Sequence, residues 1–293
     1  MTIPRRPVTL GIVLVALLLA ATAIYLKWSG ARRFSDPRTL LSRFPVEDAI
    51  VLNIDFSAIR LAGLLPDSKA PLEPEYKQFL DGSGFDYRHD LDSVTATISN
   101  SGNFFIARGR FNWPKLQDYA SKQGGSCYQD LCRMPGSRPE RRISFLPLRD
   151  DVIALAVSTD DLAANRLTKP GDPLTAELPN APAWLIVPGS ALHDPNAFPP
   201  GLRLMLSALT NADRLVLTAG LSGTTMEATC RTKEDAHILA SQLRVAMATL
   251  KEADQDQLAK ALSSGTFEDT GTTKVTGQWP FSKALLADLT SGL

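Results

Sequence analysis

Cys127 and Cys132 are the residues whose type and spacing point most directly to chemistry. They lie in the stretch GGSCYQDLCRMPG, where glycine and proline predict a loop. A pair this close in a loop can form a disulfide if the Cα atoms come within ~7 Å. A zinc site would need further Cys or His ligands nearby, and a thioredoxin-like redox pair has fewer intervening residues. The spacing therefore predicts a structural disulfide, which persists in an oxidising compartment.

Ser190, His193 and Asp194 have the residue types of a hydrolytic triad. They lie three and four positions apart in a proline-flanked loop, where triad geometry is rare. Phosphate-binding glycine loops, zinc-binding helix motifs and nucleophile elbows do not occur in the sequence. We therefore assign no catalytic residue, no metal ligand and no cofactor. An enzyme whose pocket gathers His89 or His193 with acidic residues remains the alternative.

Four aspartates, Asp81, Asp86, Asp90 and Asp92, crowd the stretch DGSGFDYRHDLDS and raise the possibility of a calcium site. An EF-hand loop needs acidic ligands at alternate positions, a central glycine and a final glutamate, and this stretch lacks that phase. Aspartate after a helix-ending glycine is typical of turns in which the side chain binds nearby backbone. The stretch therefore predicts turns before a strand.

Arg133, Arg138, Arg141 and Arg142 form a basic loop, with Arg149 close behind, in an otherwise acidic body. Such a cluster can contact phospholipid, anionic glycan or an acidic partner protein. The alternative is a solvated loop with no partner. We keep these arginines as candidates for an anionic contact.

Alternating and helical hydrophobic patterns define the elements that must position these residues. Asn112 and Thr232 are predicted helix N-caps, and Cys230 is predicted to be a small buried side chain of a strand. Strands are predicted over 49–56, 91–99, 103–111, 143–148, 152–157, 183–187, 214–221, 225–231 and 272–279, and helices over 57–65, 74–81, 114–123, 159–167, 201–209, 233–253 and 281–289.

A proline-rich connection over 168–182 divides this pattern into a first half, 48–167, and a second half, 183–293. Each half reads as strand, helix, hairpin, helix, strand and helix, which indicates a tandem structural duplication. Hairpins imply antiparallel pairing. The predicted class is α+β: antiparallel sheets with helices packed on one face, in two structurally similar halves preceded by one transmembrane helix.

The N-terminal segment supplies that predicted helix. Val8–Leu26 is a run of nineteen residues without a charge, long enough at 1.5 Å per residue to span roughly 28 Å. We assign 1–28 as a membrane anchor and 29–47 as a polar tether. Small residues at 21–23 leave open a cleaved signal peptide.

Charge is distributed unevenly along the chain. Residues 1–38 carry six basic side chains and one acidic side chain, while the rest carries 25 basic and 30 acidic ones. An acidic body argues against nucleic-acid binding. Basic residues after the anchor favour a cytoplasmic body, whereas the signal-like layout and the cysteine pair favour export. We expect a single-pass protein of the cell membrane with most of the chain periplasmic.

The stretches PVEDAIVLNIDFSAIR and GFDYRHDLDSV carry a resemblance to uncharacterised N-terminally membrane-anchored envelope proteins of bacteria. The resemblance covers 45–167 and rests on Asp48, Asp55, Gly84, Phe85, Asp86, Asp90 and Leu91. It implies an anchored, exported domain and supplies no catalytic residue. We therefore expect a non-catalytic extracytoplasmic protein that contacts envelope proteins or cell wall through its sheet or its arginines. The alternative is a hydrolase or a small-molecule or lipid-binding protein.

Overall fold

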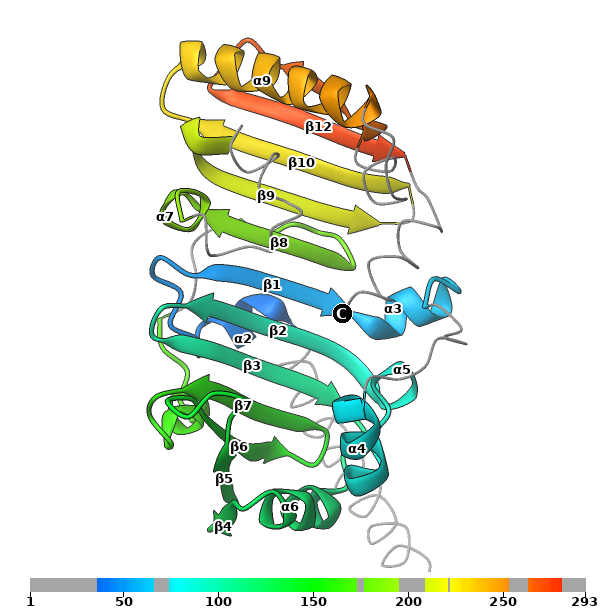
Figure 1. Cartoon of the computed structure of the whole chain (residues 1–293), viewed down its shortest axis with the longest axis vertical. Helices are drawn as coiled ribbons and strands as arrows, with labels where there is room; N and C mark the ends of the chain where they lie inside the picture. Colours follow the sequence, from blue (N-terminus) through cyan, green and yellow to red (C-terminus); the bar gives the residue numbers. More distant parts are fainter. Residues whose placement is uncertain are drawn as a thin grey trace, which may run out of the picture.

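The fold is built on one continuous antiparallel sheet (Figure 1). The computed structural model describes residues 36–65, 74–172, 177–194, 209–220, 222–252 and 263–280. In these residues twelve strands join in the order β11-β12-β10-β9-β8-β1-β2-β3-β7-β6-β5-β4. The strands are β1 (Ile50–Asp55), β2 (Leu91–Ser99), β3 (Gly102–Gly109), β4 (Ser126–Tyr128), β5 (Leu131–Pro135), β6 (Arg142–Arg149), β7 (Val152–Ser158), β8 (Ala183–Pro188), β9 (Ala212–Gly220), β10 (Gly223–Cys230), β11 (Thr266–Asp269) and β12 (Lys274–Pro280).

Shorter elements surround the sheet. The helices are α2 (Pro37–Leu41), α3 (Phe56–Leu61), α4 (Pro74–Ser83), α5 (Tyr87–Asp90), α6 (Trp113–Lys122), α7 (Gly189–Leu192) and α9 (Lys233–Glu252), with 3-10 turns η1 (Ala163–Thr168) and η3 (Leu209–Asn211).

The β1–β8 pairing joins the two parts of the chain at the centre of the sheet. Leu52 of β1 lies opposite Ala96 of β2 on one side and Leu185 of β8 on the other. The prediction of separate sheets in two tandem halves is therefore wrong, because the strands on both sides of residues 168–182 share one hydrogen-bonded ladder. Outward from this pair the order is β2-β3-β7-β6 on one side and β9-β10-β12-β11 on the other.

Helices cover both faces of the sheet, so the prediction of helices on one face is also wrong. Successive residues of a strand point to opposite faces. Ile153 packs in one cluster with Leu116 of α6. Its neighbour Ala154 packs in another with Leu41 of α2 and Leu167 of η1. The hydrophobic pattern of β7, buried on both sides, required partners on each face.

Helix α9 lies on the same face as α6, at the opposite end of the sheet (Figure 1). Side chains on this face follow one row across the strands: Phe145, Leu155, Phe105, Ala96, Leu52, Leu185, Leu217 and Met226. Leu239 and Leu243 of α9 are fully buried against the far end of this row. The apolar stripe predicted for the long helix therefore packs on the sheet.

Both predicted helix caps are confirmed. Asn112 accepts a hydrogen bond from the backbone N–H of Lys115 at 3.2 Å. The Thr232 hydroxyl accepts from the N–H of Asp235 at 3.0 Å and donates to the Asp235 carboxylate at 2.8 Å. These bonds satisfy donors that a helix leaves free at its first turn.

Gly102 begins β3 directly after the turn of the β2–β3 hairpin and has φ 145°, a value that favours glycine. A Cβ atom at this position would lie 3.0 Å from the backbone oxygen of Val157 in β7. The turn residue therefore also permits close approach of the third strand.

Several element predictions differ from the structure. The cysteine stretch, predicted to be a loop, forms the hairpin of β4 and β5, and β11 was not predicted. The helix predicted over 159–167 is the short turn η1. The helices predicted over 201–209 and 281–289 fall wholly or mainly outside the described residues.

The predicted membrane segment, 8–26, also lies outside the described residues. Among the residues that the structure does describe, none of the helices has the length and apolar character needed to cross a bilayer.

Candidate functional site

A half-open cavity of about 680 Å³ lies where the central strands end. Its walls come from both sides of the β1–β8 pair: the end of β1, the start of β8, the end of β9, and positions of β2 and β3 next to them. Helices α2 and α3 and the segment 178–182 complete the lining. A volume of this size is in the range of ligand pockets. The cavity is therefore our candidate binding site.

The chain turns sharply at the end of β1, and this turn shapes one wall. The carboxylate of Asp55 caps α3 by accepting from the N–H of Ala58 at 2.9 Å and from the hydroxyl of Ser57 at 2.6 Å. The N–H of Asp55 donates to the carbonyl of Pro182 at 2.7 Å. Asp55 thus joins β1 to both α3 and the 178–182 segment, and its carboxylate is already hydrogen-bonded.

Asp36, the second acidic residue of the lining, is used in the same way. It accepts from the N–H of Arg38 at 3.1 Å and from the hydroxyl of Thr39 at 3.0 Å, which caps α2. Both carboxylates at the cavity therefore serve helix starts.

Much of the remaining wall is apolar. Trp184 of β8 is 4% exposed and forms part of the cavity surface. Leu40 of α2, Ile59 of α3 and Leu178 of the connection also line it. Such a wall favours burial of an apolar ligand, at about 25 cal/mol per Å² removed from water.

Arg108 of β3 brings a guanidinium to this wall. Its Nε atom is buried and has no hydrogen-bond partner. Most buried polar atoms in proteins are hydrogen-bonded, and exceptions are frequent at functional positions. Arg108 lies directly opposite Ser93 of β2, which is opposite Asp55 of β1, so these three positions form one row beneath the cavity.

Asn53 adds an amide group one step along β1. This residue is 7% exposed, and its Oδ1 accepts a 2.8 Å hydrogen bond from the hydroxyl of the fully buried Thr95. This bond orients the amide plane, so the nitrogen of Asn53 is the remaining donor of a side chain that lines the cavity.

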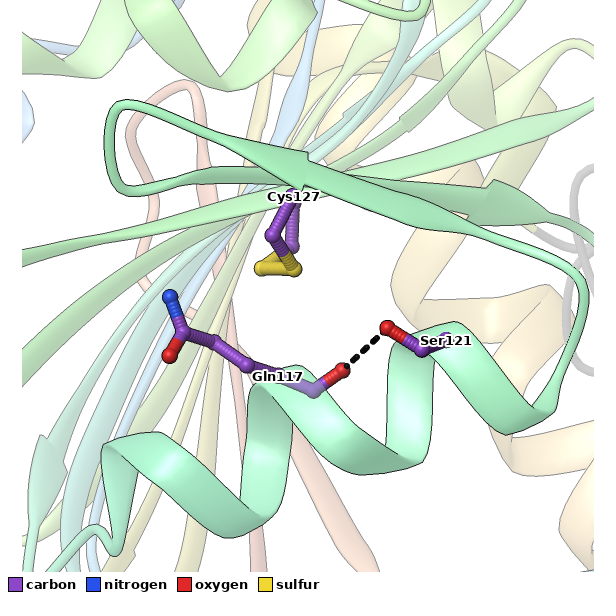
Figure 2. The surroundings of a disulfide bond; sticks show 4 residues. Gln117, Ser121 and Cys127 are labelled. Atoms are coloured by element: carbon purple, nitrogen blue, oxygen red, sulfur yellow. Dashed lines mark hydrogen bonds between the residues drawn. A yellow bond between two sulfur atoms is a disulfide. The ribbon is translucent and has the colours of Figure 1, made fainter.

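The predicted disulfide is confirmed. Cys127 and Cys132 lie opposite each other in the β4–β5 hairpin, with an S–S distance of 1.97 Å and Cα atoms 4.0 Å apart. Figure 2 shows the bridge on the side of the hairpin that faces α6, near Gln117 and Ser121. It packs in the cluster of Leu116 and therefore fixes the end of the sheet under this helix.

The arginine cluster lies beside the same hairpin, remote in the strand order from the cavity's central strands. Arg133 forms an ion pair with Asp161 at 3.3 Å, and Arg149 forms one with Asp151 at 3.1 Å. Arg138 and Arg142 are exposed, and Arg141 is half-buried. The contact of this cluster with an anionic partner stays a prediction.

The aspartate-rich stretch forms the turns that its sequence predicts. Asp86 caps α5 by accepting from the N–H of Arg88 at 3.0 Å, and it also accepts from the Arg88 guanidinium and the Tyr76 hydroxyl, both at 3.0 Å. Burial opposes ionisation of Asp86, but the hydrogen bonds from Arg88 and Tyr76 outweigh it and lower the pKa of the carboxyl. Burial and the Asp86 carboxylate raise the pKa of Tyr76 to about 12.

The structure does not bring the three triad-like residues into triad geometry. The Ser190 hydroxyl donates to Asp48 at 3.3 Å. A ring nitrogen of His193 lies 2.7 Å from the carbonyl oxygen of Thr210. Serine and histidine are thus each engaged elsewhere. Within the described ranges, moreover, His, Cys, Asp and Glu do not gather in a group able to hold a metal ion.

Cys230 is 4% exposed, as the strand pattern predicts. Burial, with a smaller effect of Asp235, raises the pKa of its thiol to about 11. A thiol that stays protonated at neutral pH is a poor nucleophile. We therefore assign Cys230 a packing role in the core and no reactive role.

The comparisons with known proteins concern the fold alone. Neither a protein-family model nor a curated protein matches the chain. Solved structures of TP0453, in crystal forms I, III and IV, are similar with TM-scores of 0.45, 0.46 and 0.47 and sequence identities of 9%, 10% and 10%. Each alignment covers 86% of this chain. The three alignments cover 96%, 98% and 96% of the TP0453 chain, in the same order.

Arg108, Asn53 and Trp184 were not predicted as site residues from the sequence. The available signal was a polar residue inside an otherwise apolar strand, as in AIVLNIDF, or at its end, as in NFFIAR. Neither pattern shows that three strands bring these residues to one cavity.

Proposed function

We propose that this chain is a non-catalytic binding protein of the cell envelope that takes a small, largely apolar molecule into the cavity at the β1–β8 junction. The cavity is the observation that carries the proposal. It has ligand-sized volume, and its lining combines apolar side chains around Trp184 with polar ones such as Asn53 and Arg108. This combination is typical of small-molecule sites.

The Ser190 hydroxyl donates a hydrogen bond to Asp48, and a ring nitrogen of His193 lies at hydrogen-bond distance from the carbonyl oxygen of Thr210. The candidates from the sequence were contact with envelope proteins or cell wall, hydrolysis, and binding of a small molecule or lipid. Among these, the cavity favours binding of a small molecule or lipid. Contact of the arginine cluster with an envelope protein or cell wall remains compatible with it.

We further propose that residues 8–26 hold the protein at a membrane, with the body on the periplasmic side. Asp36, which lines the cavity, lies ten positions after Leu26. Even fully extended, this connection reaches at most about 36 Å. An anchored chain would therefore keep the cavity close to the bilayer, where apolar molecules are concentrated.

Photo-crosslinking of the full chain in detergent tests the proposed function. The probe is an uncharged hexadecanol that carries a diazirine in its alkyl chain. Irradiation should label peptides that contain Ile59 or Trp184, identified by mass spectrometry. Ala58→Trp, which fills space beside α3, should reduce this labelling severalfold, whereas Ala248→Trp on the exposed side of α9 should leave it unchanged.

Labelling confined to residues 8–26 would contradict the proposed function. Equal labelling of the cavity peptides in the Ala58→Trp variant and the unmodified chain would contradict it as well.

A further inference from the structure

We infer that the cavity selects molecules with an anionic head group, which Arg108 binds, and an apolar body that lies along Trp184. The inference rests on the proposed function and specifies its ligand class. It starts from the burial and hydrogen bonding of the Arg108 side chain.

Arg108 is half-buried, and its Nε is fully buried without a hydrogen-bond partner. A buried donor that has lost its contact with water and gained no acceptor costs free energy. An anion in the cavity would supply the missing acceptor.

The protein's own carboxylates at the cavity do not meet this need. Asp36 and Asp55 each accept hydrogen bonds at the start of a helix. Asp55 is also separated from Arg108 by β2, because Ser93 lies between them in the row. The guanidinium is thus available to a ligand, while Asp36 and Asp55 are engaged at the helix starts.

Two neutral side chains can assist at the same place. Ser93 is the direct cross-strand partner of Arg108, a position at which side chains lie about 5 Å apart. Asn53, held by Thr95, presents its amide nitrogen from the next strand. Arginine binds carboxylate and phosphate through two parallel hydrogen bonds, so both head groups fit this chemistry.

The apolar part of the cavity gives the ligand its second feature. Leu40, Ile59, Leu178 and Trp184 line the cavity together with Arg108. A head group at Arg108 would therefore leave an attached alkyl chain in contact with these side chains. The ligand class is an amphiphile with one acidic head, such as a fatty acid or an alkyl phosphate.

Competition against the crosslinking probe tests this inference with the full chain in detergent. The competitors are palmitate, hexadecyl phosphate and hexadecanol, which share one chain length and differ in the head. We expect palmitate or hexadecyl phosphate to displace the probe at about tenfold lower concentration than hexadecanol. The stronger of the two anions identifies carboxylate or phosphate as the preferred head.

Variants of Arg108 test whether this residue causes the preference for an anionic head group. Arg108→Gln should abolish the tenfold advantage while the uncharged probe still binds, and Arg108→Lys should retain part of it. Arg214→Gln, an exposed arginine of β9 outside the cavity lining, should keep the full advantage. Circular dichroism checks that each variant is folded.

Equal competition by hexadecanol and both anions would overturn the inference and leave the proposed function intact. An unchanged preference in folded Arg108→Gln or Arg108→Lys would overturn the role of Arg108. Failure of the uncharged probe to label the cavity at all would overturn the proposed function itself.

Discussion

Asp86 shows how individual polar residues of this chain are committed to local structure. Its carboxylate is 17% exposed and binds Arg88, Tyr76 and the start of α5 at once. The same residue type in the same stretch had raised the question of a calcium site. Hydrogen bonds within the turn account for the position of Asp86, and Arg108 differs from it because its buried Nε lacks a partner.

The lowered pKa of Asp86 predicts a pH dependence of stability. A carboxyl whose pKa is lower in the folded state stabilises the protein above its unfolded pKa, near 3.9, and loses this contribution as pH falls through the folded value. Asp86→Asn should lower the free energy of unfolding at pH 7 by about 1–3 kcal/mol, since hydrogen bonds to a charged group are lost.

Urea denaturation at pH 7 and at pH 3 measures this effect. The gap between the unmodified chain and Asp86→Asn should narrow at the lower pH. Asp81→Asn, at an exposed position of α4, is the matched control and should change little at either pH. A gap that stays constant between the two pH values would contradict the assignment.

At the scale of elements, the β4–β5 hairpin ends the sheet and depends on the disulfide. Bridging Cys127 and Cys132 closes a short loop, which stabilises by about 2 kcal/mol in the chain-entropy model. Reduction, or Cys127→Ser with Cys132→Ser, should therefore lower the thermal midpoint and expose the hairpin to proteases.

Thermal unfolding with and without dithiothreitol measures the loss. Cys230→Ser should still show the shift on reduction, because Cys230 is free and buried in another cluster. A thermal midpoint that does not respond to reductant would show that the bridge contributes nothing to stability.

Helix α9 is held to the sheet by its buried stripe. Leu243 is fully buried, whereas Val245, two positions on, is 64% exposed. Leu243→Ala should destabilise the protein by about 2–5 kcal/mol through lost contacts and a cavity. Val245→Ala should change stability by no more than about 0.5 kcal/mol. Chemical denaturation measures the free energy of unfolding of both variants. Equal losses of stability would contradict the packing of α9 on the sheet through Leu243.

At the scale of the whole molecule, the β1–β8 pair makes one sheet from two chain segments and forms the floor of the cavity. A strand at the edge of a sheet exposes unpaired backbone groups and invites association. Because β8 pairs with β1, removal of the residues after 168 would leave β1 as an edge strand at the former centre of the sheet.

A chain that ends at Thr168 should therefore self-associate and lose amide protection along β1. Analytical ultracentrifugation and hydrogen exchange measure the two effects. A chain that ends at Pro280 retains all described strands and serves as the control. A monomeric shorter chain with protected β1 amides would contradict the dependence of β1 on β8.

Local patterns predicted the elements well where the information was local. The strand predicted over 91–99, the capping residues Asn112 and Thr232 and the stripe of α9 all correspond to observed structure. The failures have a common origin. The β4–β5 hairpin is short and is flanked by Gly124, Gly125 and Gly136, and it is stabilised by the pairing of β5 with β6 and by the disulfide.

The sequence by itself determined the β2–β3, β6–β7 and β9–β10 hairpins, the helix caps and the disulfide, because each depends on residues a few positions apart. Only the tertiary structure decided that both parts share a single sheet, that helices cover both faces, and that Arg108 meets Asn53 and Trp184 at one cavity. These features depend on pairing between strands more than a hundred residues apart, such as β1 and β8. Hydrophobic alternation states which face a strand buries and does not state which strand lies beside it.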